Sequence, residues 1–252
     1  MFDLHCHILP GVDDGADSWE ESLEMARISL DSGVRTVVAT PHMSPDLSPE
    51  QVSRLVEELG LRLSAQGLPL KVVPGMEARL EPDLPELLRS GRVLPVGGRY
   101  LLLELPHFSL PVYTGELLFK VMLSGYQVIL AHPERNARVM ENPGLVFEWV
   151  SRGMLVQVNS GSILGKFGSR VRQAAEMLVK AGLVHFLGSD AHSASGRRPD
   201  MGEAVKVLGR LTPMAQEIAA LNGHLLLQGD FAPPEGAAQP PGTGGWRRWW
   251  RR

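Results

Sequence analysis

The sequence predicts an α/β fold in which strands and helices alternate along residues 1–228. Seven short apolar runs recur at intervals of about 30 residues, which is the length of one strand–helix–strand unit. The runs lack strict alternation of polar and apolar residues, as expected for parallel strands that are buried on both faces. Seven such units are typical of a barrel or of a doubly wound sheet, and the pattern alone does not separate the two.

The strands are predicted first, from the apolar runs at 2–7, 35–40, 70–76, 100–105, 126–131, 154–159 and 184–189. Helix starts fill the gaps between them. Ser18 with Glu21 has the form of a capping box, and so does Ser48 with Gln51,. Each pair precedes an apolar stripe with helical spacing, so each gap contains a helix that packs on the strands.

Later helices are predicted to begin near Thr114 and near Asn142, with two more at 201–210 and 213–222. Glycine is the residue most often found just after a helix, because it adopts a left-handed backbone without strain. Glycines at 33, 125, 153 and 182 stand where these helices should end.

Composition places the chain among ordinary globular proteins, with 44% apolar and 21% charged residues,. Cys6 is the only cysteine, so no internal disulfide can form and a reducing compartment is expected,. The N-terminus lacks a basic stretch followed by an apolar run, so no signal peptide is expected,. Together these features predict a cytoplasmic protein.

The last residues differ from the rest. Residues 229–252 are predicted to be a Pro/Gly-rich linker and a disordered Arg/Trp tip,. Residues 232–252 carry a net charge of +3, which leaves −6 for the rest of the chain. An acidic body argues against nucleic-acid binding, which depends on neutralising phosphates. For the tip, weak contact with an anionic membrane surface and no role at all both stay open.

Metal-type side chains occur at the end of almost every predicted strand. Because the carboxyl ends of parallel strands meet at one edge of the fold, we expect these side chains to lie together. The candidate ligands are His5, His7, Asp14, His42, Glu77, Glu104, His132, Asp190 and His192.

Local spacing supports a shared site. His5 and His7 are two residues apart on a strand and should point to one face, with Cys6 pointing the other way. Asp190 and His192 repeat this spacing near the other end of the chain. Asp14 lies in a glycine-rich loop that can fold over the first strand.

Five imidazoles and four carboxylates are too many ligands for one ion, so two or three ions are expected. Nitrogen and oxygen ligands without thiolate indicate Mn²⁺, Fe, Zn²⁺ or Mg²⁺. The ions would offset the carboxylate charge, and the resulting site suits a phosphate dianion. A single histidine at a strand end is more often structural, but the pattern over seven strands favours a metal site.

Motifs that contain these residues occur together over residues 1–225. They are DLHCHILPGVDDGADS at 3–18, ATPH at 39–42, PGME at 74–77, LLLELP at 101–106, AHPERN at 131–136, QVNSGSILGKFG at 157–168 and LGSDAHS at 187–193. The chain resembles the PHP (polymerase and histidinol phosphatase) superfamily and, within it, the bacterial capsular and exopolysaccharide tyrosine phosphatases. The C-terminal tail has no counterpart in this pattern.

The resemblance implies a distorted (β/α)7 barrel with a trinuclear, typically manganese-dependent site, and it assigns ligand roles to the same nine positions. It also implies hydrolysis of phosphotyrosine on a partner tyrosine kinase that controls polysaccharide synthesis. The alternatives are a PHP phosphatase of a small molecule such as histidinol phosphate, a TatD-like nuclease, and a non-catalytic regulatory protein. The acidic body weighs against the nuclease.

Phosphate binding needs cationic side chains beside the ligands. Arg135 follows His132 by three residues and is the candidate catalytic group, since a guanidinium can hold two phosphate oxygens,. Arg197 and Arg198 follow His192, and one of them is expected to bind substrate. Asn159 either orients a group at the site or caps a helix. A cysteine nucleophile is not expected, because no arginine follows Cys6 at the phosphatase-loop spacing,.

Overall fold

The computed structural model describes residues 1–232, and most of the predicted linker with the Arg/Trp tip lies outside the described residues. The strands are β1 (Phe2–Cys6), β2 (Thr36–Ala39), β3 (Lys71–Pro74), β4 (Glu77–Arg79), β5 (Tyr100–Glu104), β6 (Gln127–Ala131), β7 (Leu155–Asn159) and β8 (Phe186–Gly188). The α-helices are α1 (Trp19–Asp31), α2 (Pro49–Ala65), α3 (Leu84–Arg89), α4 (Thr114–Leu123), α5 (Ala137–Glu141), α6 (Gly144–Ser151), α7 (Ser160–Ile163), α8 (Ser169–Lys180), α9 (Gly202–Leu211) and α10 (Asn222–Gln228). A 3₁₀ turn, η1 (Pro133–Arg135), and a π-helical turn, η2 (Glu217–Leu221), complete the set.

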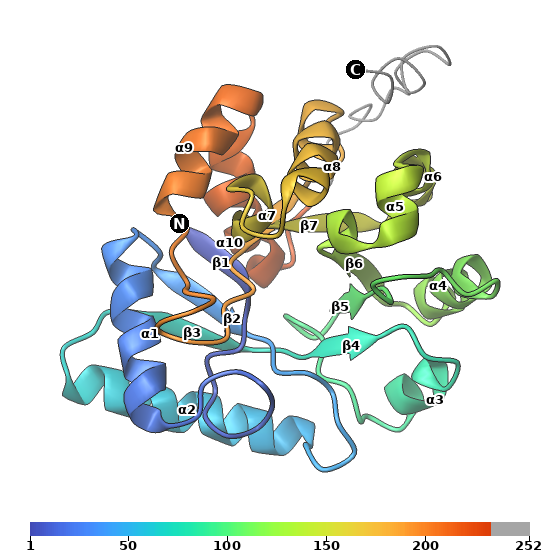
Figure 1. Cartoon of the computed structure of the whole chain (residues 1–252). Helices are drawn as coiled ribbons and strands as arrows, with labels where there is room; N and C mark the ends of the chain where they lie inside the picture. Colours follow the sequence, from blue (N-terminus) through green and yellow to red (C-terminus); the bar gives the residue numbers. More distant parts are fainter. Residues whose placement is uncertain (233–252) are drawn as a thin grey trace.

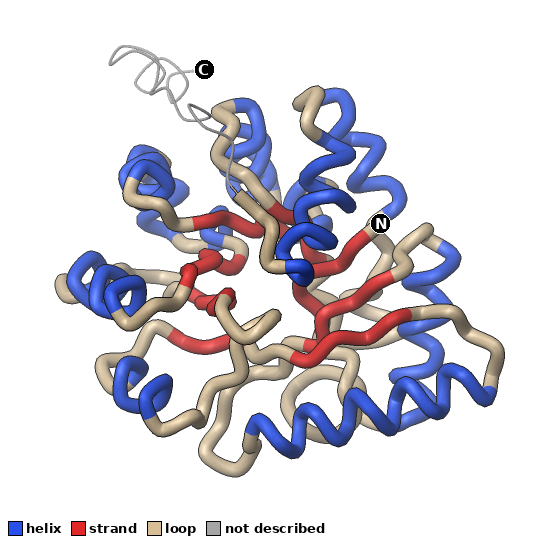
Figure 2. Tube along the Cα trace, turned by 180° about the vertical axis from the view of Figure 1, so that it is seen from behind, coloured by secondary structure: helices blue, strands red, loops and turns tan. Residues whose placement is uncertain are grey.

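The strands form two parallel sheets, in the orders β1-β2-β3 and β4-β5-β6-β7-β8. Isolated parallel bridges join the sheets at both ends, between His42 and Glu77 and between Cys6 and Ala191. The strands therefore follow one another around a ring, with helices outside it (Figures 1 and 2). The predicted α/β fold is confirmed, and the bridges close the strands into a distorted barrel-like ring rather than an open doubly wound sheet.

The third predicted strand, 70–76, differs from the structure, where this stretch yields β3 and then β4 in separate sheets. The chain breaks at Gly75, where a Cβ atom would lie 2.8 Å from Val96 Cγ2. Only glycine permits so close an approach. The break frees Glu77 to start a new strand and to form the bridge with His42.

An extra residue in β1 changes which side chains face the inside of the ring. Asp3 pairs with Val37 but Cys6 pairs with Ala39, so three steps along β1 match two along β2. Such a bulge reverses the alternation of faces beyond it. Consequently Phe2, Leu4 and then His5 all face inward, and Cys6 packs in the outer core instead.

The interior of the ring holds a small apolar core below the site. It consists mainly of Phe2, Leu4, Val38, Leu102, Ile129, Leu155 and Phe186. Leu226 of α10 packs on this core, and the ring of Phe231 lies 5.0 Å from that of Phe186. Since Phe2 begins β1, α10 closes the amino-terminal end of the ring. Contact with the core reaches Phe231, beyond the predicted boundary at residue 228.

Helix starts agree in part with the predictions. Ser48 and Gln51 form the reciprocal capping box at α2. Ser18 accepts a hydrogen bond from Glu21 N, but the Glu21 carboxylate does not return to Ser18. It accepts from Ala194 N instead, at 3.1 Å, and so ties α1 to the loop after β8. Among the helices of residues 1–232, none combines the length and apolar character that a membrane span requires.

Candidate metal centre

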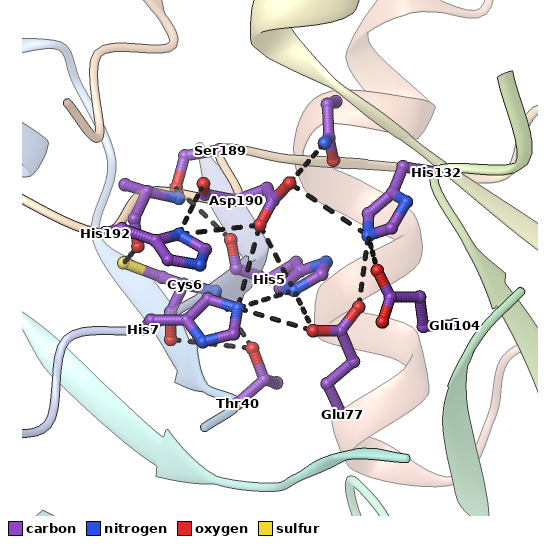
Figure 3. A network of polar contacts seen from close by, with 12 residues as sticks. His5, Cys6, His7, Thr40, Glu77, Glu104, His132, Ser189, Asp190 and His192 are labelled. Carbon is purple, nitrogen blue, oxygen red and sulfur yellow. Dashed lines mark hydrogen bonds and ion pairs between the residues drawn. The ribbon is translucent and has the colours of Figure 1, made fainter. Parts of the chain in front are cut away.

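The structure brings all nine candidate ligands together at the carboxyl ends of the strands. Figure 3 labels seven of them, all except Asp14 and His42. Their donor atoms form four overlapping groups, and within each group the atoms lie within 4.8 Å of one another. The groups are His7 with Asp14, His42 and His192; His5 with His132 and Asp190; His5 with His7 and Glu77; and His42 with Glu77 and Glu104. The shared members join the groups into one cluster.

Glu77 is the centre of the cluster. Its Oε2 lies 3.3 Å from His5 Nε2, 3.4 Å from His7 Nε2 and 3.1 Å from His42 Nδ1. Its Oε1 lies 3.0 Å from His132 Nε2. Burial alone would raise the pKa of Glu77, but the charge of His5 and hydrogen bonds from the other imidazoles hold it well below its usual range,. The carboxylate is therefore ionised and able to bridge ions.

Asp190 is the second carboxylate that several imidazoles of the cluster approach. Its Oδ1 lies 3.6 Å from Nε2 of both His5 and His7, and its Oδ2 accepts from Asn159 Nδ2 at 2.6 Å. Asp190, at φ 52°, and His132, at φ 31°, are the two non-glycine residues with positive φ in the described chain. This conformation is costly, and such strain gathers at functional sites because the surrounding structure enforces it.

Several imidazoles are oriented by an acceptor on their far nitrogen. His7 Nδ1 lies 2.7 Å from Asp13 Oδ2, His5 Nδ1 lies 3.2 Å from Gln157 Oε1, and His192 Nδ1 lies 3.1 Å from the Asp190 carbonyl. In each case Nε2 is left facing the cluster. Outer partners of this kind fix the tautomer of metal-binding histidines. The roles of Asp13 and Gln157 were not predicted from the sequence.

The electrostatics of two histidines differ sharply. Burial alone would lower the pKa of His7, but hydrogen bonds to Asp13 and Glu77 raise it to about 10. For His192, burial and then the positive charges of His7 and Arg197 lower the pKa to about 4. A cluster that stabilises positive charge at His7 is one in which a cation can replace a proton.

The loop after β1 folds over the cluster as predicted. Asp14 Oδ1 lies 3.5 Å from His42 Nε2 and 3.4 Å from His192 Nε2. The next residue, Gly15, packs so tightly that a Cβ atom there would lie 2.3 Å from His7 O. A side chain at position 15 would clash with His7, so the position requires glycine. The close contact also holds the neighbouring Asp14 over the ends of the strands.

The cluster opens into a cavity of about 480 Å³. Arg135 and Arg197 both line it, and both guanidinium groups pair with Asp190 Oδ2, Arg135 at 2.8 Å. The Phe167 ring lies 4.7 Å from Arg135 Cζ and 5.8 Å from Arg197 Cζ. Arg198 is exposed and does not line the cavity, so of the two adjacent arginines the structure brings only Arg197 to the site.

Two further residues complete the site. Asn159 stands at the N-cap position of α7 without a capping hydrogen bond from its side chain; instead the side chain links Gln157 to Asp190 and so orients a group at the site, one of the two roles predicted for it. His107, which the sequence analysis left outside the ligand set, lines the cavity with its Nε2 3.8 Å from Glu104 Oε1. It lies beyond a strand end in a loop, so the periodicity of the strands gave no signal for it.

The donor set fits divalent cations. Imidazole nitrogens and carboxylate oxygens face one another with several ring nitrogens directed at the same oxygen, and no thiolate takes part among the described residues. His5 Nε2 and His7 Nε2 lie only 3.0 Å apart. Such crowding of acceptor nitrogens is relieved when cations are held between them.

Comparison with known proteins places the chain in a family. Residues 1–228 match the family described as capsular polysaccharide synthesis, CpsB/CapC. The chain is 39% identical over 212 residues to the tyrosine-protein phosphatase YwqE of Bacillus subtilis, covering 82% of this chain and 84% of that protein. It is 29% identical over 221 residues to the tyrosine-protein phosphatase CpsB of Streptococcus pneumoniae, covering 83% and 90%.

Solved structures agree with these matches. A structure from a study of YwqE of Bacillus subtilis and CpsB of Streptococcus pneumoniae, described there as unique metal-dependent tyrosine phosphatases, superposes with a TM-score of 0.89 at 36% identity and covers 95% of this chain and 99% of that chain. A histidinol phosphate phosphatase from Lactococcus lactis shares the fold, with a TM-score of 0.54 at 13% identity over 86% of this chain and 94% of that one. The resemblance drawn from the motifs is thereby confirmed, and the chain belongs to the CpsB/CapC family of capsular polysaccharide synthesis.

Proposed function

We propose that this chain is a metal-dependent protein-tyrosine phosphatase. The observation that carries the proposal is one cluster of nine candidate ligand residues that opens into a cavity lined by two arginines. Donors for several cations together with guanidinium groups are what hydrolysis of a phosphate monoester requires. The relatives described above, at 39% and 29% identity, are tyrosine-protein phosphatases.

The nine cluster residues would hold two or three ions, and Glu77 belongs to two of the four donor groups. We propose Mn²⁺ as the native metal, and Fe, Zn²⁺ or Mg²⁺ would suit the same donors. When bound, divalent ions neutralise phosphate charge and lower the pKa of water toward neutrality.

The arginines would bind the phosphate oxygens of the substrate. Both reach Asp190 from the cavity side, so a phosphate placed between them and the cluster would meet two guanidinium groups. Arg197 Nε is buried, and within residues 1–232 it has no hydrogen-bond partner. A buried donor without an acceptor is costly, and a phosphate oxygen would satisfy it.

Leaving-group chemistry favours an aryl phosphate. The tyrosine phenolate has a pKa of about 10 and departs with little protonation, whereas a serine alkoxide is far more basic. Strong general acids are therefore less important for phosphotyrosine. We propose a phosphotyrosine protein as substrate, specifically a bacterial tyrosine kinase that regulates capsular or exopolysaccharide synthesis.

The location follows from this proposal. We place the phosphatase in the cytoplasm, and the Arg/Trp tip supplies the composition for weak contact with anionic lipid,. Deletion of residues 233–252 tests this contact. Binding of the protein to anionic vesicles should fall, and unchanged binding would exclude a role of the tip in membrane contact.

Initial rates test the activity itself. Turnover of a phosphotyrosine peptide should require Mn²⁺, should stop with EDTA, and should be lost in His132→Ala. A phosphoserine peptide and histidinol phosphate should be poor substrates. Preference for histidinol phosphate would move the protein to the small-molecule phosphatases, and metal binding without any turnover would favour a regulatory protein.

A further inference from the structure

The rim of the cavity carries an exposed aromatic ring. Phe108 follows His107, which lines the cavity, and the two rings lie 6.3 Å apart in an edge-to-face arrangement. Phe108 is 87% exposed. Its neighbours along the loop behave differently, since Leu105 is buried and Leu110 and Tyr113 pack against the core. The loop thus packs Leu105, Leu110 and Tyr113 inward and presents the Phe108 ring to solvent beside the cavity lining; Val112, farther along the loop, is exposed as well.

The loop between β5 and α4 is anchored on both sides of Phe108. The His107 carbonyl accepts a hydrogen bond from Ala137 N at 2.8 Å, and the Ser109 carbonyl accepts one from Asn136 Nδ2 at 3.1 Å. Asn136 and Ala137 directly follow η1, which carries Arg135. The position of Phe108 is therefore coupled to the segment that holds the phosphate-binding arginine, and its exposure is part of the built rim.

We propose that Phe108 is a specificity-determining residue that contacts an apolar side chain next to the phosphotyrosine of a polypeptide substrate. This inference rests on the proposed function. With the phosphate between the cluster and Arg135, the substrate backbone must leave the cavity over its rim. Consecutive Cα atoms are 3.8 Å apart, so residues one or two positions from the tyrosine lie at that rim.

The apolar Phe108 ring would favour some phosphorylated substrates over others. Aromatic rings are frequent anchors in protein recognition, and an exposed ring beside a cavity is placed to contact the chain of a bound polypeptide. A small phosphate such as histidinol phosphate would not reach Phe108. The ring would therefore favour phosphotyrosine in a chain with a leucine, methionine or aromatic neighbour over phosphotyrosine flanked by glycine.

The test compares two phosphotyrosine peptides that differ only at the flanking positions, one with leucine and one with glycine. In Phe108→Ala, KM for the leucine-flanked peptide should rise about three- to tenfold, the range for loss of one aromatic contact. The kcat of that peptide should be retained, and the preference for leucine over glycine should shrink by the same factor. Phe119→Ala is the matched control and should keep the preference, because Phe119 is an exposed aromatic on α4 whose chain neighbours do not line the cavity, whereas Phe108 directly follows His107.

The outcomes separate this inference from the proposed function. If the wild type hydrolyses both peptides and Phe108→Ala changes neither KM nor their ratio, the specificity role is overturned while the phosphatase assignment stands. An equal loss in Phe108→Ala and Phe119→Ala would also overturn it. If the metal-loaded wild type hydrolyses no phosphotyrosine at all, the proposed function fails and the inference falls with it.

Discussion

Asp13 Oδ2 lies 2.7 Å from His7 Nδ1 and accepts a hydrogen bond from the His42 backbone N–H at 2.8 Å. One carboxylate therefore positions two candidate ligands that come from different strands. It also accepts from Gly15 N through Oδ1 at 2.9 Å, which fixes the loop that carries Asp14. Asp13 holds the site without being a member of the ligand set.

Replacing Asp13 with Asn should weaken metal binding about 10- to 100-fold, as is usual when an outer partner of a histidine ligand is changed. The amide can donate to Nδ1, which would place the His7 proton on the nitrogen that faces the cluster. Titration calorimetry of Mn²⁺ into metal-free protein measures the affinity. Asp17→Asn, an exposed change in the same loop, is the control. Equal affinities in both variants would rule out this role for Asp13.

The two neighbouring arginines should differ strongly. Arg197→Ala should lower kcat/KM for a phosphotyrosine peptide about 10- to 100-fold, because a charged hydrogen bond contributes about 1.5–3 kcal/mol. Arg197→Lys should recover only part of this, since lysine cannot bind in a planar two-point manner. Arg198→Ala should stay close to wild type because Arg198 does not line the cavity. A larger loss for Arg198 than for Arg197 would contradict the geometry.

Metal removal should lower thermal stability. Ions that bind only the folded protein stabilise it by about 2.7 kcal/mol at a hundredfold excess over Kd. For a chain of this size the expected fall in Tm with EDTA is about 5–10 °C. Glu77→Gln, which removes the central carboxylate charge, should show little further shift with EDTA. A wild-type Tm that changes neither with chelator nor with added Mn²⁺ would argue against a metal site.

His185, a buried histidine outside the metal cluster, should make the free energy of unfolding depend on pH. Burial lowers the pKa of His185 to about 4 in the folded protein, and its Nδ1 accepts a hydrogen bond from Val156 N at 3.1 Å. Between pH 6.5 and 4 the unfolded chain binds a proton that the folded chain does not, so stability falls as pH falls. Urea unfolding at pH 7 and 4.5 should show a loss of about 2–3 kcal/mol from this residue. In His185→Asn the loss of unfolding free energy between pH 7 and 4.5 should be smaller by this amount. An equal loss in wild type and His185→Asn would refute the prediction.

Two glycines offer a test of the packing at the closed end of the ring. A Cβ atom at Gly223 of α10 would lie 2.2 Å from Phe2, so Gly223→Ala should destabilise the protein by about 1–3 kcal/mol,. Gly209 in α9 has open space, and Gly209→Ala should stabilise by about 0.5–1 kcal/mol,. Denaturant unfolding measures both. A Gly223→Ala variant as stable as wild type would mean that α10 does not close the ring.

The sequence predicted the strands well because buried parallel strands leave short apolar runs with metal-type residues at their ends. It missed the break at Gly75, since Met76 continues the apolar run. It also missed the bulge in β1, because an extra residue in a buried strand changes the facing of side chains without changing their polarity. Both irregularities are set by contacts with neighbouring strands.

At the site, residue types and spacing were sufficient to predict that the nine cluster residues lie together. They were not sufficient to predict which other residues orient them. Asp13 and Asp14 are alike in sequence, and only the path of the loop separates the one that orients His7 from the one that reaches His192. Arg197 and Arg198 pose the same problem. His107 depends on a loop whose course is set by residues near Asn136, about 30 positions later.

The contact between β1 and β8 has a consequence for synthesis of the protein. The bridge between Cys6 and Ala191 joins the first strand to the last, and the ligand candidates His5 and Asp190 flank that seam. A growing chain cannot complete the cluster until nearly all of its folded part has left the ribosome. A product that stops before residue 190 keeps most of its helices but lacks the final donors. The complete cluster, and any activity that depends on it, therefore requires a chain that extends past His192.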